Sequence, residues 1–577
     1  MGLTPKSPFE APQFTPPPLV AKPPRSVASS SPGRWLAGAS AAATPYLLLL
    51  VTSFLMFAET TDDPFITFRY AANLVAGRGP VFNPGEHVEG FSSPLHLLIC
   101  AAALKIFPGA GMLIKLKVAS LLFGFACLFQ TGTLARVAGL GRSDRILAQT
   151  LVALNANFAI AAGNALETTL FGVVSVWAMT LFIRESIRRQ GWWSSFALFL
   201  AVLCRPEAFA AFALLAGVRG WQAVQARFPW RDAAKWASAF CLLALALTFA
   251  RLMYYHAPLQ NTYYAKQGPL WLDLKFGTES LVQCLSPVRL EPSTFRTGNA
   301  TLSQALQPVI APVFWGLALL GSSARRRRVG GAVGMALGAS VFAFCIAAWR
   351  SGGDWMFGCR FLAPALPMLA VLQCLGLRTI ADWRSRWTAP SLNRKTRPAP
   401  RFGPTRAAVV AIWSCALVAS PWKSWSSSHF ATSDEGILIH SSIGFGPLWV
   451  RVGRYMESDL PPGAVVVYSE MGYGPYKNLD KRFIDLRGLT DTEIARLPSR
   501  LKRYIGVWDP RWKTDSDDPL HKILARRKFD AIIDIFPPEK GPEIVFGKYV
   551  CRATLQITAT GTGRQWHVAV YSERDVD

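Results

Sequence analysis

Long apolar blocks constrain this sequence more than any other feature. About a dozen apolar runs occur along the chain, and several approach or exceed the roughly 20 residues that an α-helix needs to cross a bilayer. Of the 577 residues, 51% are hydrophobic and only 17% are charged, whereas an ordinary soluble domain has about 25% charged residues. These runs exclude a soluble enzyme and a disordered or collagen-like chain. The sequence therefore predicts a mainly α-helical, polytopic membrane protein.

Three regions follow from the distribution of apolar residues. Residues 1–35 are rich in proline and serine, which predicts a disordered cytoplasmic tail. The next block, Trp35 to Phe57, is too long and starts too late for a cleaved signal peptide, so it predicts a first span. Residues 36–420 form the expected transmembrane domain, and residues 421–577 form an expected extracytoplasmic α/β domain.

Eleven spans are expected, together with one shorter helix. Block 94–107 follows Ser-Ser-Pro and predicts a juxtamembrane or dipping helix in the first outer loop. The Arg205-Pro206 break separates two short blocks, which predicts a hairpin that reaches only partway across. The expected spans are 35–57, 113–135, 146–163, 168–183, 192–204, 206–218, 234–253, 306–322, 329–348, 360–378 and 405–420.

The basic residues predict an orientation. The net charge is +25, and the Lys and Arg residues cluster in short loops between apolar blocks, such as 325–328 and 378–406. Short cytoplasmic loops attract such residues, so the tail is expected inside and the C-terminal domain outside. The sequence lacks the basic stripe with interleaved aromatic residues that is typical of a nucleic-acid-binding surface, so no nucleic-acid partner is predicted. Membrane lipids are the expected surroundings.

After Pro421 the pattern changes to alternating strand-like and helix-like runs. The strand-like runs are 464–468, 531–535 and 567–571, and the helix-like runs are 490–503 and 520–527. Such alternation predicts an α/β domain with its own core.

The first outer loop begins with two adjacent carboxylates, Asp62 and Asp63. Pro64 follows them, and proline at the first helical position is typical of a helix start. Asp63 is therefore expected to be the N-cap, which leaves Asp62 free for a proton, a cation or a substrate hydroxyl. The alternative is that the pair has no chemical role, with one aspartate capping the helix and the other exposed to water. Further along this loop, Glu86, His87 and Glu89 could bind a cation or simply face water.

The same loop carries ordered motifs. Asp-Asp-x-Phe-Ile-Thr-x-Arg-Tyr starts at Asp62, and Val-Phe-Asn-Pro-Gly-Glu-x-Val-Glu-Gly-Phe-Ser-Ser-Pro starts at Val81. Together they resemble the GT-C glycosyltransferases, especially arabinofuranosyltransferases of the mycobacterial AftB type. Asn164-Ala165 departs from this pattern, because relatives often have Ser-Gly there. The resemblance continues at 163–168, 205–207, 261–266, 352–354 and 483–491.

The resemblance implies a GT-C fold in a bacterial inner (plasma) membrane. It also implies transfer of a sugar from a polyprenyl-phosphate donor to an envelope glycan or lipid acceptor on the extracytoplasmic face. The implied mechanism is inverting, with an Asp of the first outer loop as the general base. Asp62 is the preferred base and Asp63 the second candidate. Metal ligands are not identified, and dependence on Mg²⁺ or Mn²⁺ stays open.

Other site residues follow from the needs of the chemistry. A leaving phosphate requires nearby cations, and sugar hydroxyls require hydrogen-bonding groups. Each candidate also has an alternative interpretation. The cations could contact lipid headgroups, the acids could have structural roles, and the tyrosines could belong to an interfacial aromatic belt. The candidates for binding donor phosphate or substrate are Arg69, Glu167, Arg205, Glu207, Tyr263, Lys266, Asp354 and Arg360.

A transporter or flippase of lipid-linked saccharides is the main alternative function. Transporters keep ionisable groups near the bilayer midplane on broken helices. Here the acids lie at expected outer helix ends, and the span interiors are nearly free of charge, which favours an enzyme. A polymerase or ligase that uses lipid-linked glycans is a variant of the same hypothesis, and a non-catalytic scaffold is the least favoured.

Overall fold

The computed structural model contains two compact units, Met1–Ala43 and Thr44–Asp577. The α/β region and the membrane helices from Thr44 onward thus belong to one unit. The structure describes residues 32–55, 57, 60–108, 111–284, 302–323, 332–352, 360–388, 430–432, 438–440, 446–498, 511–536, 544–546, 548–559 and 564–573. Residues 1–31 of the expected tail 1–35, the loop 325–328, the span 405–420 and Asp354 lie outside the described residues, and the last four residues of that tail belong to the first helix.

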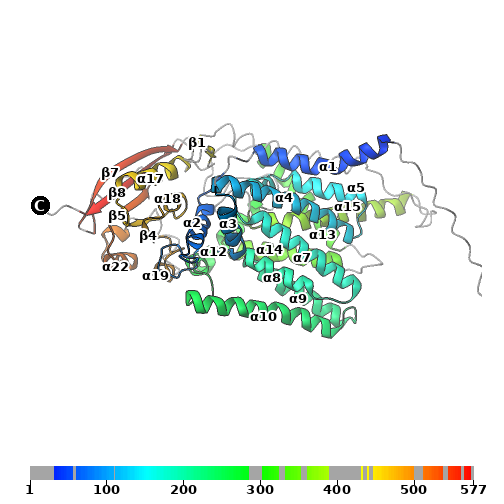
Figure 1. Cartoon of the computed structure of the whole chain (residues 1–577). Helices are drawn as coiled ribbons and strands as arrows, with labels where there is room; N and C mark the ends of the chain where they lie inside the picture. The colour runs from blue at the N-terminus through cyan, green and yellow to red at the C-terminus, as the bar shows by residue number, and fades with distance from the viewer. Residues whose placement is uncertain are drawn as a thin grey trace, which may run out of the picture. The chain divides into compact units, whose positions relative to one another are not determined.

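Helices make up the first two thirds of the described chain (Figure 1). They are α1 (Pro32–Leu55), α2 (Asp63–Val75), α3 (Pro94–Ile106), α4 (Met112–Val137), α5 (Arg142–Ala153), α6 (Ala156–Gly163), α7 (Thr168–Arg188), α8 (Trp193–Cys204), α9 (Ala208–Val224), α10 (Trp230–Tyr255), α11 (Asn261–Ala265), α12 (Leu270–Cys284), α13 (Leu302–Ser322), α14 (Ala332–Arg350), η2 (Ala363–Ala365) and α15 (Leu366–Thr388).

Five helical stretches of the described chain are long and apolar enough to cross a membrane, and a sixth results if α5 and α6 count as one. The five are α4, α7, α10, α14 and Ala363–Trp383. Shorter apolar helices cover Ser40–Leu55, Pro94–Ile106, Trp193–Cys204, Ala208–Val224 and Pro312–Ser322. The chain is thus a multi-pass membrane protein, but the expected count of eleven spans is met only in part.

Two helix breaks shape the bundle. The span expected over 146–163 is divided into α5 and α6, which meet at a bend of 67° and form either one broken span or a re-entrant pair. Asn155 causes a new helix start there, since its side chain accepts hydrogen bonds from the backbone N–H groups of Asn157 and Phe158. The break at Arg205-Pro206 is confirmed, because α8 ends at Cys204 and α9 begins at Ala208.

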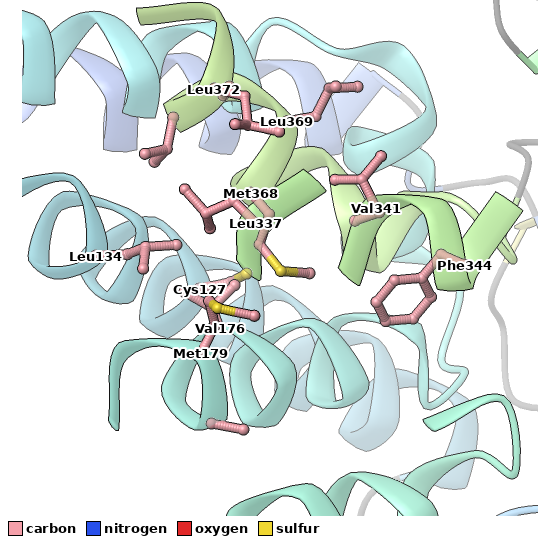
Figure 2. Packing of buried hydrophobic residues seen from close by; sticks show 14 of the residues in the cluster. Cys127, Leu134, Val176, Met179, Leu337, Val341, Phe344, Met368, Leu369 and Leu372 are labelled. Carbon is pink, nitrogen blue, oxygen red and sulfur yellow. The ribbon is translucent and has the colours of Figure 1, made fainter. Parts of the chain in front are cut away.

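Most helices of the bundle contribute to one membrane core, and Figure 2 shows the part of it that is formed by side chains of α4, α7, α14 and α15. Glycine allows the closest approaches. A Cβ atom at Gly321 of α13 would lie 1.9 Å from the carbonyl oxygen of Leu372 in α15, and one at Gly376 would lie 2.1 Å from that of Leu317. Small residues commonly bring membrane helices this close.

The C-terminal region contains a mixed six-stranded sheet in the order β4-β3-β5-β8-β7-β6. Strand β3 pairs in parallel with β4 and β5, whereas the other neighbours are antiparallel. The strands are β3 (Val465–Tyr468), β4 (Arg482–Asp485), β5 (Ala531–Phe536), β6 (Ile544–Val545), β7 (Tyr549–Ala559) and β8 (Arg564–Glu573). A separate antiparallel pair is formed by β1 (Phe430–Thr432) and β2 (Leu438–His440).

Within the described residues, four short helices and one longer helix accompany the sheet. They are α17 (Gly446–Asp459), α18 (Tyr473–Lys477), α19 (Thr492–Ala495), α21 (Arg511–Thr514) and α22 (Pro519–Ala525). The three expected strands and the helix near 520–527 are confirmed. The helix expected over 490–503 is much shorter in its described part, because it ends at Ala495.

The two faces of the sheet pack into different cores, as the two-residue repeat of a strand requires. Val466 and Tyr468 of β3 point into a core that also contains Phe65 and Phe68 of α2. Val467, between them, points into the opposite core with α22. The first outer loop and the α/β region therefore share one hydrophobic core.

The orientation can be tested by cysteine labelling. Ala76 after α2 and Ser143 in α5 are both exposed, and the positive-inside argument assigns them to opposite sides of the membrane. We expect a membrane-impermeant thiol reagent to label Ala76→Cys in intact cells but Ser143→Cys only after lysis, with the parent protein as background. The reverse order would contradict the proposed orientation.

Candidate active site

The two aspartates of the first outer loop have different surroundings. The expectation that Asp63 is an N-cap is wrong: Asp63 is the first residue of α2, and Asp62 occupies the cap position without capping that helix. The Asp62 carboxylate instead accepts hydrogen bonds from the backbone N–H groups of Gly472 and Tyr473, both at 2.7 Å. Asp62 is only 4% exposed, so the expectation that it is free to face a cleft is also wrong.

Electrostatics agrees with an enclosed position for Asp62. Burial raises the pKa of its carboxyl group, and the nearby acids Glu470 and Asp63 raise the pKa further. The two backbone N–H groups act in the opposite direction, and the resulting pKa is about 8. Burial thus outweighs the two peptide N–H groups and favours the protonated form of Asp62 near neutral pH.

Asp63 points toward a different partner. Its side chain is 27% exposed, and its Oδ2 atom accepts a hydrogen bond from Nη1 of Arg360 at 2.9 Å. Arg360 precedes η2, far along the chain, and is 6% exposed. Asp63 is thus a carboxylate with solvent access and a fixed cation beside it.

A second group of charges lies at the breaks between helices. Arg205, between α8 and α9, contacts Glu167 through Nη1 at 2.5 Å and Glu207 through Nη2 at 2.6 Å. Its Nε also donates to Glu207. Glu167 and Glu207 immediately precede α7 and α9, where carboxylates are favourable. Two carboxylates engage Arg205, so the expectation that it is available to a phosphate does not hold.

Arg360 connects the two groups. The guanidinium carbons of Arg205 and Arg360 lie 4.8 and 5.4 Å from the centroid of the Phe361 ring. Burial by itself would raise the pKa of Glu167, but Arg205, His96 and Arg360 lower it to about 2. The cluster of Asp63, Arg360, Glu167, Arg205 and Glu207 is hereafter the acid–arginine cluster.

Arg69 lies outside this cluster, which corrects its expected role. It is fully buried and donates to the carbonyl oxygens of Phe82 at 2.9 Å, Asn478 at 2.9 Å, Lys481 at 2.7 Å and also Pro475. These contacts use its donors within the protein. Arg69 therefore joins α2 to the α/β region and does not face a ligand.

Tyr263 and Lys266 lie in and just after the short helix α11. Both side chains are exposed. Asn261, at the start of α11, donates from Nδ2 to the carbonyl oxygens of Gly488 at 2.8 Å and Leu489 at 3.0 Å. This contact brings two of the sequence motifs together, because 261–266 meets 483–491.

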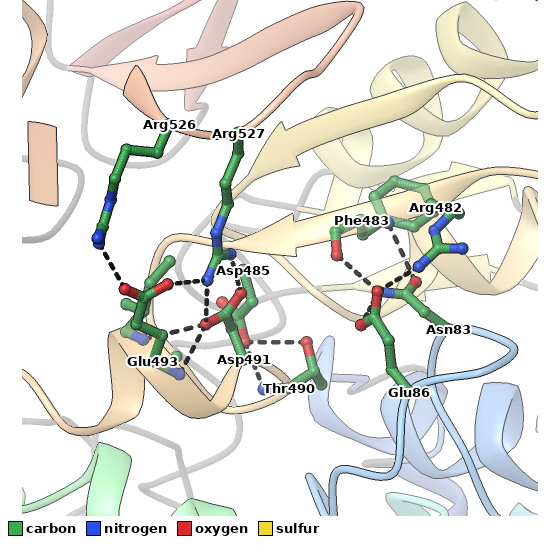
Figure 3. Close-up of polar contacts among 12 residues, drawn as sticks. Asn83, Glu86, Arg482, Phe483, Asp485, Thr490, Asp491, Glu493, Arg526 and Arg527 are labelled. Carbon is green, nitrogen blue, oxygen red and sulfur yellow. Dashed lines mark hydrogen bonds and ion pairs between the residues drawn. The ribbon is translucent and has the colours of Figure 1, made fainter. Parts of the chain in front are cut away.

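The possible cation site at Glu86, His87 and Glu89 is not formed. Glu86 pairs with Arg482 at 2.5 Å, Glu89 pairs with Arg251 at 2.9 Å, and His87 packs on Tyr254 with ring centroids 4.5 Å apart. Figure 3 shows Glu86 and Asn83 reaching β4. Across the described part of the chain, no group of three or more His, Cys, Asp or Glu side chains could hold a metal ion.

Sequence reasoning missed several residues near this site. His96 is buried in α3 and acts electrostatically on Glu167, but a lone histidine gives no sequence signal. Glu470 pairs with Arg487, which lies in the motif 483–491. Ala165, in the departing Asn-Ala pair, has φ of 61°, a backbone conformation that favours glycine.

The fold and the site define a multi-pass membrane protein with a charged cluster at helix ends. A family described as a domain of unknown function (DUF8728) matches residues 441–571. No curated protein matches the chain.

Two similar solved structures are of ArnT from Cupriavidus metallidurans. The structure bound to undecaprenyl phosphate is 12% identical with a TM-score of 0.47, and the likeness covers 93% of this chain and 98% of that one. The apo structure is 11% identical with a TM-score of 0.46, covering 92% and 98%.

Proposed function

We propose that this protein transfers a sugar from a polyprenyl-phosphate donor to an acceptor hydroxyl, with Asp63 as the general base. The acceptor class is an envelope glycan or lipid on the extracytoplasmic face. The motifs that resemble GT-C glycosyltransferases support the reaction class. One observation carries the choice of base: Asp63 combines solvent access with a hydrogen bond to Arg360.

The proposed chemistry assigns a role to each side of this pair. Asp63 takes the proton of the acceptor hydroxyl while the new glycosidic bond forms, as general bases do. The bond between the sugar and the phosphate breaks, and negative charge accumulates on the leaving phosphate. Arg360, which donates to Asp63, is the cation that we assign to the leaving phosphate.

The remaining candidates form the proposed substrate-binding set. The two carboxylates held by Arg205 supply rigid acceptors for sugar hydroxyls, because their positions are fixed at helix starts. Tyr263 and Lys266, both exposed, extend the set toward the α/β region. Asp354 belongs to it by resemblance and lies outside the described residues.

A transporter remains the alternative to be tested against this proposal. The bend between α5 and α6 is a feature that transporters also use. The side chain that caps α6 at this bend is the uncharged Asn155, whereas the acid–arginine cluster lies at the starts of α2, α7 and α9. This distribution supports chemistry at helix ends over ion-coupled movement through the membrane.

The experiment is a donor panel with purified protein in detergent. We expect one polyprenyl-phosphate sugar to release free polyprenyl phosphate in an acceptor-dependent way. Heat-inactivated protein is the control. The transporter would be favoured if labelled lipid-linked saccharide crosses the membrane of proteoliposomes and no donor releases free polyprenyl phosphate.

A further inference from the structure

A short helix of the α/β region, α18, lies against α2 with its two ends held by α2 residues. At its start, the Asp62 carboxyl group accepts hydrogen bonds from the backbone N–H groups of Gly472 and Tyr473. At its end, Arg69 donates to the carbonyl oxygens of Pro475, Asn478 and Lys481. We call this arrangement the α2–α18 clamp.

The clamp satisfies backbone groups at both ends of α18. The first N–H groups and the last C=O groups of a helix have no partners within it, so Asp62 supplies acceptor atoms at the start and Arg69 supplies donors at and beyond the end. The spacing fits as well. Seven residues of α-helix rise about 10.5 Å, which brings Asp62 and the long Arg69 side chain to opposite ends of the shorter α18.

Aromatic packing closes the space between the two ends. The Phe65 ring lies 5.1 Å from that of Tyr473, and the Phe68 ring lies 5.7 Å from that of Tyr476, both in edge-on geometry. At Gly472, a Cβ atom would lie 2.1 Å from the Asp62 carbonyl oxygen. The contact therefore leaves no room for a side chain at position 472.

This clamp acts next to the proposed base. Asp62 and Asp63 are joined by one rigid peptide unit, so the contact that holds Asp62 also limits where Asp63 can lie. Arg360 reaches Asp63 from a separate part of the chain. A misplacement of about 1 Å at a reacting group can lower a rate by a factor of about 10².

We propose that the α/β region is a positioning element of the catalytic unit, and that Asp62 is the positioning residue through which it acts. The α2–α18 clamp holds the start of α2 so that Asp63 meets Arg360 and the acceptor hydroxyl. This inference rests on the proposed function. It assigns a role to the segment 441–571, which matches a family of unknown function.

The test weakens the clamp from both sides. Asp62→Asn keeps the shape but turns one amide N–H₂ group toward a backbone donor, and Gly472→Ala forces the chains apart. Each should lower kcat about 10- to 100-fold while the donor KM changes less than about threefold. The double variant should lose less than the product of the two effects, because both changes remove one contact.

Asn83→Ala is the matched control. Asn83 also joins the first outer loop to the α/β region, with two hydrogen bonds to the backbone of Phe483 at 2.8 and 3.1 Å. It should keep kcat within about twofold, although it removes a similar number of hydrogen bonds from the same interface. Unchanged kcat in both clamp variants, or an equal loss in Asn83→Ala, would overturn the proposal.

Hydrogen–deuterium exchange separates this inference from the proposed function. Both clamp variants should speed exchange at residues 60–66 more than Asn83→Ala does, whether or not any donor is used. Faster exchange in a protein that transfers no sugar would support the clamp and contradict the proposed reaction. Unchanged exchange would overturn the clamp in either case.

Discussion

Asp63→Asn is expected to lower the rate of sugar transfer by a factor of about 10²–10⁴, the usual effect of removing a general base. The amide can still accept the hydrogen bond from Arg360, but it cannot take the proton of the acceptor hydroxyl. Donor KM and the thermal unfolding midpoint should change little. Initial rates of polyprenyl-phosphate release measure the effect.

Asp62→Asn serves as the comparison, because it changes the neighbouring carboxylate in the same way. Its loss should be smaller, since Asp62 acts on position and not on the proton. If Asp62→Asn is inactive while Asp63→Asn retains full activity, Asp62 is the base and the assignment made from the contacts is wrong.

The largest expected effect on stability comes from Arg69→Met. Methionine fills similar volume but removes the guanidinium donors from the buried carbonyl oxygens of Phe82, Asn478 and Lys481. The first two oxygens keep other donors, Asn73 Nδ2 and the backbone N–H of Lys481. A hydrogen bond to a charged group contributes about 1.5–3 kcal/mol, so we expect a total loss of about 3–5 kcal/mol. The thermal unfolding midpoint in detergent should fall clearly.

Arg78→Met is the matched control, because Arg78 is exposed just after α2 and its Nη1 donates to Oδ1 of Asn73 at 3.2 Å. Its unfolding midpoint should stay close to that of the parent protein. An equally small shift for Arg69→Met would show that the α/β region is not anchored through this side chain.

Much of the architecture could be predicted from local patterns. Apolar blocks of bilayer length predicted the long helices, and Arg205-Pro206 predicted the break between α8 and α9. Strands β3, β5 and β8 followed from short apolar runs, because a buried strand needs little more than a few branched residues. The bend at Asn155 was missed, because a single polar cap inside an apolar run leaves the average hydropathy nearly unchanged.

The candidate site was predicted as a set of residues but not as a set of roles. Glu167, Arg205 and Glu207 do come together, and Asp63 does meet Arg360. Arg69 is an arginine within a sequence motif, as Arg205 is, yet Arg69 donates to backbone carbonyl oxygens. Sequence position alone does not distinguish a buried guanidinium that satisfies the backbone from one that faces a ligand.

The sequence by itself determined that this chain crosses a membrane, that its helices break at Arg205-Pro206, and which loop gathers carboxylates. These features depend on local composition, because the hydrophobic effect and backbone geometry act over a few turns. Only the tertiary structure distinguished the surroundings of Asp62 from those of Asp63. Their contacts involve Gly472 and Arg360, which lie hundreds of residues away, and a hydrogen bond requires its partner within about 3 Å.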